Sequence, residues 1–154
     1  MNYGTKKYRQ CWMKENTMSI QIEQIPGECI IRAIVNEPFD PENDISTMFA
    51  QFIHIRQTIN GPIALIIDLN NTNNAPDAFS RVVLTLAEAA RGIRASKQAQ
   101  LAGPPILIFV GSGSLADLVT QAVEQEQYGG AKAHLCATQE EALALAREKL
   151  SASK

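Results

Sequence analysis

A run of small polar residues, Gly111-Ser112-Gly113-Ser114, directly follows the apolar segment ILIFV at 106–110. When a helix begins at such a turn, its backbone N–H groups can hold a phosphate. The spacing G-x-G-x-x-A is a short form of the dinucleotide-binding fingerprint. That fingerprint belongs to the first strand–helix unit and needs an acidic residue about 20 positions later. Here the run follows the fourth expected strand, and the next strand ends in Ala137-Thr138 with no acid at its tip.

Ser114 and Asp117 have the spacing of a capping box, which explains Ser114 without any ligand. We therefore interpret 111–114 as a capped turn from strand to helix. Binding of an anion by the N–H groups of this turn is the alternative.

Asp68 lies in a second suggestive run, LIIDLNN, at the tip of an apolar strand. A phosphoryl-accepting aspartate at such a tip also needs an acidic pair to hold magnesium and a lysine at the end of the last strand. The first expected strand ends in Ile25-Pro26 and the last in Thr138, so neither requirement is met. We predict instead that Asp68 hydrogen-bonds the turn behind its strand.

Parallel strands gather the polar residues that follow them at one edge of the sheet, where ligands bind in open α/β folds. The candidate binding residues at this edge are Asp68, Asn70, Asn71, Thr72, Asn73, Asn74, Asp77, Ser112, Gly113 and Ser114. The set contains no His, Cys, Lys or Arg, so a nucleophile would lack an activating base. We therefore expect no catalytic residue and no cofactor. His134 and Cys136 point to one side of a strand, but two ligands do not make a metal site, and we expect no metal.

The elements that position these residues follow from the pattern of apolar residues. SIQIEQI and CIIRAIV flank Pro26-Gly27 and predict an antiparallel hairpin. Asp40-Pro41 begins a helix that Asn60-Gly61-Pro62 ends, and the buried strand IALIIDL follows. The remaining expected elements are a helix from Asp77, the strand ILIFV, a helix from Ser114 to Tyr128-Gly129-Gly130, the strand AHLCA, and a helix from the capping box Thr138-Gln139-Glu140-Glu141 to Leu150.

This order, β-β-α-β-α-β-α-β-α, predicts an α/β fold. We expect a mixed, mostly parallel sheet of about five strands, opened by a β-hairpin and packed against about four helices. Residues 18–154 form one domain in this interpretation. Residues 1–17 carry four basic side chains and one acidic side chain, and they show no hydrophobic period. They are expected to be a basic, disordered extension.

Composition excludes several classes of protein. The chain has 154 residues and a formal net charge of −2, which gives no general attraction to nucleic acid. No apolar run is long enough to cross a membrane, and the N-terminal segment has no apolar core of a secretory signal. The 3 cysteines are widely spaced, as expected of reduced thiols in a cytoplasmic protein.

The order of elements, together with LIIDLNN followed by a capped helix, resembles the STAS domains. These are the anti-sigma-factor antagonists of bacteria and their SpoIIAA-like relatives. The chain also resembles a divergent STAS/SEC14-like group, and that resemblance implies a lipid or another apolar ligand as the alternative. The resemblance covers most of residues 18–150. It implies a small regulatory module that binds a partner protein, and in the antagonists a serine at the start of the second helix is phosphorylated to release that partner.

The family pattern at this point is roughly D-L-S-G-V-x-x-x-D-S-S-G. When the pattern is aligned from Asp68, Asn70 and Asn71 stand in place of its Ser-Gly. Pro76, Asp77 and Ala78 stand in place of its Asp-Ser-Ser. The acceptor serine is missing, so Asp77 can at most imitate a fixed negative charge.

We therefore expect a non-enzymatic regulatory module that binds a protein partner. A small-ligand domain that takes a lipid, a nucleotide or another anion is the alternative. Homodimerisation fits a small regulatory domain, and neither nucleic-acid binding nor membrane insertion is expected.

Overall fold

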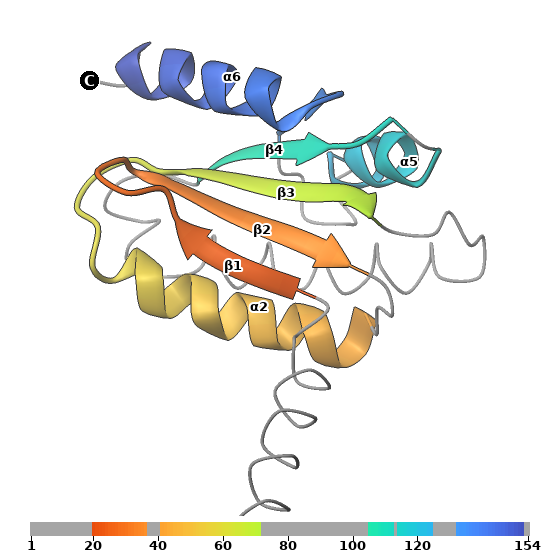
Figure 1. Ribbon diagram of the computed structural model, residues 1–154, viewed down its shortest axis with the longest axis horizontal. Coiled ribbons are helices and arrows are strands. Elements are labelled where there is room, and N and C mark those ends of the chain that lie inside the picture. Colours follow the sequence, from red (N-terminus) through yellow and green to blue (C-terminus); the bar gives the residue numbers. More distant parts are fainter. Residues whose placement is uncertain (1–19, 37–40, 72–104, 113, 125–131, 153–154) are drawn as a thin grey trace, which may run out of the picture.

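The computed structural model (Figure 1) describes residues 20–36, 41–71, 105–112, 114–124 and 132–152. These residues form a five-stranded mixed sheet in the order β1-β2-β3-β4-β5. The strands are mainly Ile, Val, Leu and Phe, whose branched or aromatic side chains favour extended backbone. The expected α/β class and mixed, mostly parallel sheet are confirmed.

The sheet opens with the predicted hairpin. Strand β1 (Ile20–Gln24) pairs antiparallel with β2 (Ile30–Asn36). The N–H of Glu28 donates to the Ile25 carbonyl at 3.0 Å across Pro26 and Gly27, and Gly27 has a φ of 75°. Proline followed by a residue with positive φ defines a type II turn, in which glycine carries no steric penalty. The expected Pro-Gly turn is confirmed.

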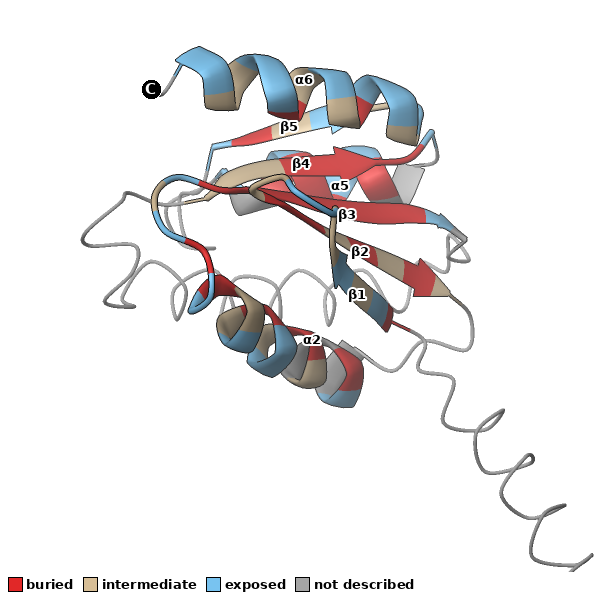
Figure 2. Ribbon diagram, turned by 60° about the vertical axis from the view of Figure 1, so that its left-hand side comes forward, coloured by how far each residue is buried: buried red, intermediate tan, exposed pale blue. Residues whose placement is uncertain are grey.

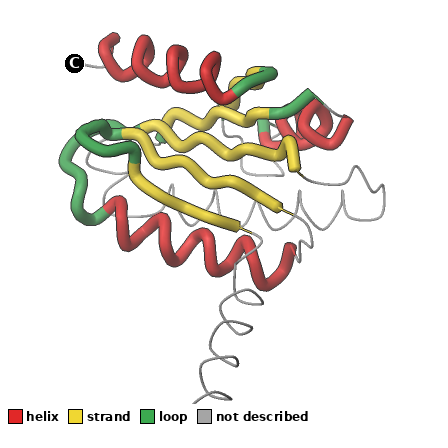
Figure 3. The backbone as a smooth tube through the Cα atoms, viewed as in Figure 1, coloured by secondary structure: helices red, strands yellow, loops and turns green. Residues whose placement is uncertain are grey.

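Helix α2 (Pro41–Arg56) connects β2 to β3 (Ala64–Asn71), which runs parallel to β2. The helix begins at the expected proline but ends before the expected Asn60-Gly61-Pro62 stop. Buried Arg56 explains the earlier end, because its guanidinium donates to the carbonyls of Ile59 and Gly61 at 2.8 and 2.9 Å. These bonds hold the segment after α2 in the loop drawn between the helix and β3 in Figure 3.

Strand β3 also differs from its expected length. Residues 63–69 are all buried, as predicted for a strand covered on both faces. The strand continues through Asn70 and Asn71, which were expected to begin a loop, because Asn71 pairs with Asn36 beyond a register shift in β2. Strands β4 (Ile106–Val110) and β5 (Ala133–Cys136) extend the parallel part of the sheet.

The described helices pack on both faces of the sheet. Helices α2 and α5 (Ser114–Val123) pack on one face, and α6 (Gln139–Ala152) lies on the opposite face over β3, β4 and β5 (Figures 1 and 2). Right-handed crossovers that advance across a sheet in one direction place their helices on the same face. The connections through α2 and α5 follow this rule.

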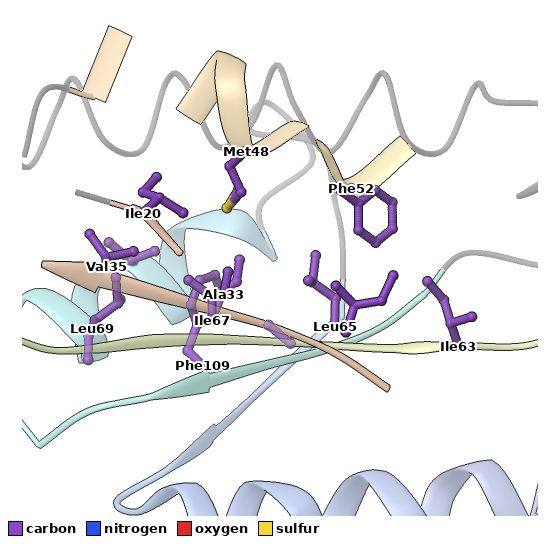
Figure 4. Packing of buried hydrophobic residues seen from close by; sticks show 14 of the residues in the cluster. Ile20, Ala33, Val35, Met48, Phe52, Ile63, Leu65, Ile67, Leu69 and Phe109 are labelled. Carbon is purple, nitrogen blue, oxygen red and sulfur yellow. The ribbon is translucent and has the colours of Figure 1, made fainter. Parts of the chain in front are cut away.

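Each face has its own apolar core. On the α2 side, Met48 and Phe52 pack over Leu65, Ile67 and their neighbours (Figure 4). On the α6 side, the cluster consists of Ile30, Ala64, Ile66, Ile108, Val110, Ala142 and Ala146.

The described residues contain three of the expected helices. The helix expected from Asp77 falls at 72–104 and lies outside the described residues, as do the expected end of the third helix at 128–130 and the N-terminal extension. No helix within the described ranges is long and apolar enough to cross a membrane.

Candidate functional site

The carboxyl ends of the parallel strands form the candidate site. Asp68 aligns with Ile34 on β2 and Val110 on β4, and Val110 aligns with Cys136 on β5. The residues just beyond this row therefore lie along one edge of the sheet. Asn70 and Ser112 are exposed there, whereas Gly111 is buried.

Asp68 is the buried acidic residue of this edge, with a relative exposure of 6%. Its Oδ1 accepts the backbone N–H of Asn70 at 2.9 Å. The predicted local hydrogen bond of Asp68 is present, but its donor lies in the last part of β3 and not in a turn behind the strand.

The other oxygen of Asp68 has a long-range partner. Gln139, in the first turn of α6, donates from Nε2 to Asp68 Oδ2 and accepts from Arg32 Nη1 at 2.9 Å through Oε1. Arg32 in turn donates from Nη2 to the Glu23 carboxylate on β1. We call Glu23, Arg32, Gln139 and Asp68 the cross-sheet polar chain. It links β1, β2, β3 and the start of α6 on one face of the sheet.

Sequence reasoning identified Asp68 but missed the other members of this chain. The bonds of Gln139 to Arg32 and Asp68 span 107 and 71 residues. Only the position of α6 above β3 brings these side chains together. The alternation along β1 and β2 does place Glu23 opposite Arg32, and this was the one local signal available.

Gly111 has a packing role that accounts for the first glycine of the Gly-Ser-Gly-Ser run. A Cβ on Gly111 would lie 2.7 Å from the Cβ of Ala116 on α5. Its N–H donates to the Cys136 carbonyl at 3.0 Å. The donor is therefore committed to the sheet and does not face a bound phosphate.

Helix α5 begins at Ser114, as expected, and α6 begins just after Thr138, the N-cap of the predicted capping box. Thr138 Oγ1 accepts the N–H of Glu141 at 3.2 Å, and Glu141 Oε2 accepts the N–H of Ala137 at 3.1 Å. The Thr138 bond satisfies a donor that the first turn of the helix leaves unpaired, whereas the Glu141 carboxylate binds the N–H of the residue before the N-cap. The capping prediction at Thr138 is confirmed.

His134 and Cys136 lie half-buried on the α6 face of β5, on the same side as expected. Burial lowers the pKa of His134, and the nearby Lys149 and Lys132 add to this effect against an opposing contribution from Glu124. Burial, together with the negative charge of Glu141, raises the pKa of the Cys136 thiol. A raised pKa reduces the thiolate fraction and with it the reactivity of the thiol.

Three of the candidate residues are described with their side chains: Asp68, Asn70 and Ser112. Asn71 and Ser114 are placed by their backbone in β3 and α5. Thr72, Asn73, Asn74, Asp77 and Gly113 lie outside the described residues. Over the ranges that are described, no group of three or more His, Cys, Asp or Glu side chains is arranged to hold a metal ion.

The arrangement suits recognition better than chemistry. Asp68 carries the one carboxylate in the described part of this edge that could act as an acid or a base. Protein donors bind both of its oxygens. Beside it, an exposed amide and an exposed hydroxyl project from the ends of adjacent strands. Such groups can donate and accept hydrogen bonds without reacting.

The chain was compared with protein-family models and with curated proteins, and no family model and no curated protein matches it.

Proposed function

We propose that this protein is a non-enzymatic regulatory module of STAS-like fold that binds a partner protein in the cytoplasm. Its contact surface is the edge at the carboxyl ends of β3 and β4, centred on Asn70 and Ser112. This surface is polar, uncharged in its described part, and built on a buried framework.

The observation that carries the proposal is the state of Asp68. A buried carboxylate with both oxygens hydrogen-bonded stabilises the end of β3 and stays out of reach of a substrate. The strand end is thereby fixed in position while Asn70 remains exposed. When exposed polar groups are attached to a rigid strand end, less conformational entropy is lost as a partner binds them.

The test compares two pairs of substitutions that add the same charge at opposite ends of the sheet. Asn70→Lys with Ser112→Lys alters the proposed surface. Gln57→Lys with Asn60→Lys is the matched control, because both residues are exposed between α2 and β3 at the other end. Tagged versions of the three proteins are expressed in the native host, and the proteins that co-purify are identified by mass spectrometry.

A partner retained by the wild type and by the control, but lost from the Asn70→Lys/Ser112→Lys variant, would support the proposal. Equal recovery of every partner by all three proteins would contradict the assignment of this surface.

The alternative function, binding of a small ligand, needs free N–H groups at the start of α5 or an apolar cavity. The Gly111 N–H is used within the sheet and is not one of these donors. A thermal-shift series with nucleotides, inorganic phosphate and fatty acids separates the two functions, because a ligand that binds the folded state raises the melting temperature. We expect no saturable shift, and a saturable one would favour the alternative.

A further inference from the structure

Strand β5 forms an edge of the sheet among the described strands. Cys136 directs its backbone polar groups toward β4, since its carbonyl accepts the N–H of Gly111. Successive residues of a strand direct these groups to alternate sides. Ala133, Leu135 and Ala137 therefore direct theirs away from the sheet, where an added strand would bind them.

Acidic side chains occupy two of these outward positions. Glu124, just after α5, accepts the N–H of Ala133 at 3.4 Å. Glu141 of α6 accepts the N–H of Ala137 at 3.1 Å. Both carboxylates lie where the backbone of an incoming strand would have to pass.

Leu135 lies between the two occupied positions and is one of two large apolar residues that the described surface exposes, at 37%. The other is Leu118 on α5, the helix that packs on β5. An exposed apolar residue on an edge strand favours pairing with another strand. The edge therefore combines an apolar attraction with two acidic obstacles.

We propose that Glu124 and Glu141 are gatekeepers that prevent β5 from pairing with β5 of a second copy of this chain. The favoured pairing is antiparallel about a twofold axis, because that register sets Leu135 opposite Leu135 of the partner, and Ala133 opposite Ala137. The same register requires the N–H groups that the carboxylates now hold. It also brings Glu124 of one copy next to Glu141 of the other, and like charges so placed repel.

This inference is independent of the proposed function, because the gatekeeping edge and the Asn70–Ser112 surface share no residue.

The test measures the self-association of the full chain carrying Glu124→Ala and Glu141→Ala. Sedimentation equilibrium gives its association constant. We expect the association constant to rise at least about tenfold over that of the wild type. Two controls separate this effect from others. Glu140→Ala/Glu148→Ala removes the same charge from exposed positions of α6, and Thr138→Ala weakens the same helix cap while leaving Glu141 on the Ala137 N–H. Both controls should associate like the wild type.

A third substitution locates the interface. Leu135→Pro removes an outward N–H that the sheet does not use, and proline is tolerated at such edge positions. Added to the double variant, it should abolish the new association, while circular dichroism shows whether each variant is folded. A folded double variant that associates no more than the wild type would overturn the proposal. Association that survives Leu135→Pro would overturn it as well, because the contact would then lie elsewhere.

Discussion

Asp68 shows how a single side chain can determine the shape of a strand end. One of its oxygens makes a local hydrogen bond, to the N–H of Asn70. The other makes a long-range hydrogen bond, to Gln139 at the start of α6. Asp68 is buried and both of its hydrogen bonds are half-buried, so loss of this acceptor leaves two donors that water reaches only in part.

Replacement of Asp68 by alanine should therefore reduce the free energy of unfolding by about 1–3 kcal/mol, since it leaves the Asn70 N–H and the Gln139 amide without their acceptor. Asp68→Asn keeps one acceptor oxygen, so its free energy of unfolding should fall by less. Urea denaturation measures both, with Glu148→Ala as an exposed reference expected to stay within about 0.5 kcal/mol of the wild type. A loss of the same small size in Asp68→Ala would show that the cross-sheet polar chain contributes little.

A second residue-scale feature is the ion pair between Glu28 in the hairpin and Arg147 on α6. Arg147 donates from Nε and Nη2 to the two carboxylate oxygens of Glu28 at 2.8 and 3.0 Å. These hydrogen bonds, aided by the charge of Arg147, lower the pKa of Glu28 against a smaller opposing effect of burial. The same bonds raise the pKa of Arg147.

The lowered pKa gives the pair a definite pH dependence. Its contribution is present above the ordinary glutamate pKa of 4.5 and is lost as the pH falls through the lowered value. The melting temperatures of the wild type and Arg147→Gln should therefore differ at neutral pH and converge in acid. Because both side chains are partly exposed, added salt should reduce the difference. A difference that persists below both pKa values would contradict an ionic origin.

At the scale of elements, the contact between the end of β4 and α5 depends on the absence of a side chain. Gly111 has no positive φ, so its backbone conformation does not require glycine. The close approach of Ala116 does require it. A motif that resembles a phosphate loop in the sequence is, at its first glycine, a close contact between a strand and a helix.

Gly111→Ala should consequently destabilise the protein by about 1–3 kcal/mol through overpacking. Ala116→Gly removes the opposing methyl group and should by itself lose about 1 kcal/mol of helix propensity. In the double variant the two changes should be less harmful than their sum. Chemical denaturation of the four proteins gives this coupling directly, and strict additivity would show that the two positions do not meet.

At the scale of the whole molecule, one sheet serves two cores. Phe52 belongs to the core on the α2 side, and Ala142 and Ala146 belong to the core on the α6 side. Both alanines are fully buried, which lets α6 lie close to the sheet. Because the strands are common to both cores, damage on one face should weaken the other.

Ala146→Leu forces an additional isopropyl group between α6 and the sheet and should destabilise the fold by about 1–3 kcal/mol. Native-state hydrogen exchange tests whether both cores lose this stability. The amides of Ile66 and Phe52 should lose protection by the same free energy if the two cores unfold together. Ala152→Leu, at the exposed end of α6, is the control. Loss of protection confined to the α6 side would show that the two cores open separately.

Much of this architecture could be predicted because its causes are local. The hairpin turn follows from Pro26-Gly27, and the start of α6 follows from Thr138 and Glu141. The end of β3 could not be predicted, because Asn71 pairs with Asn36 on another strand. The end of α2 was missed although its cause is local, because the sequence does not show that the Arg56 side chain binds the carbonyls of the next loop.

The candidate site shows the same division. The bond of Asp68 to the N–H two residues away could be predicted, whereas its bond to Gln139 depends on which face of the sheet α6 covers. The turn at Gly111 was recognised, but its reason, the position of Ala116, required the structure.

The position of α6 has a consequence for synthesis of the chain. A ribosome completes all five strands before the residues of α6 emerge, because α6 follows β5 in the chain. Until then, Ile66, Ile108 and Val110 lack the helix that buries them on that face. While α6 is absent, these residues form an uncovered apolar surface, of the kind that chaperones recognise.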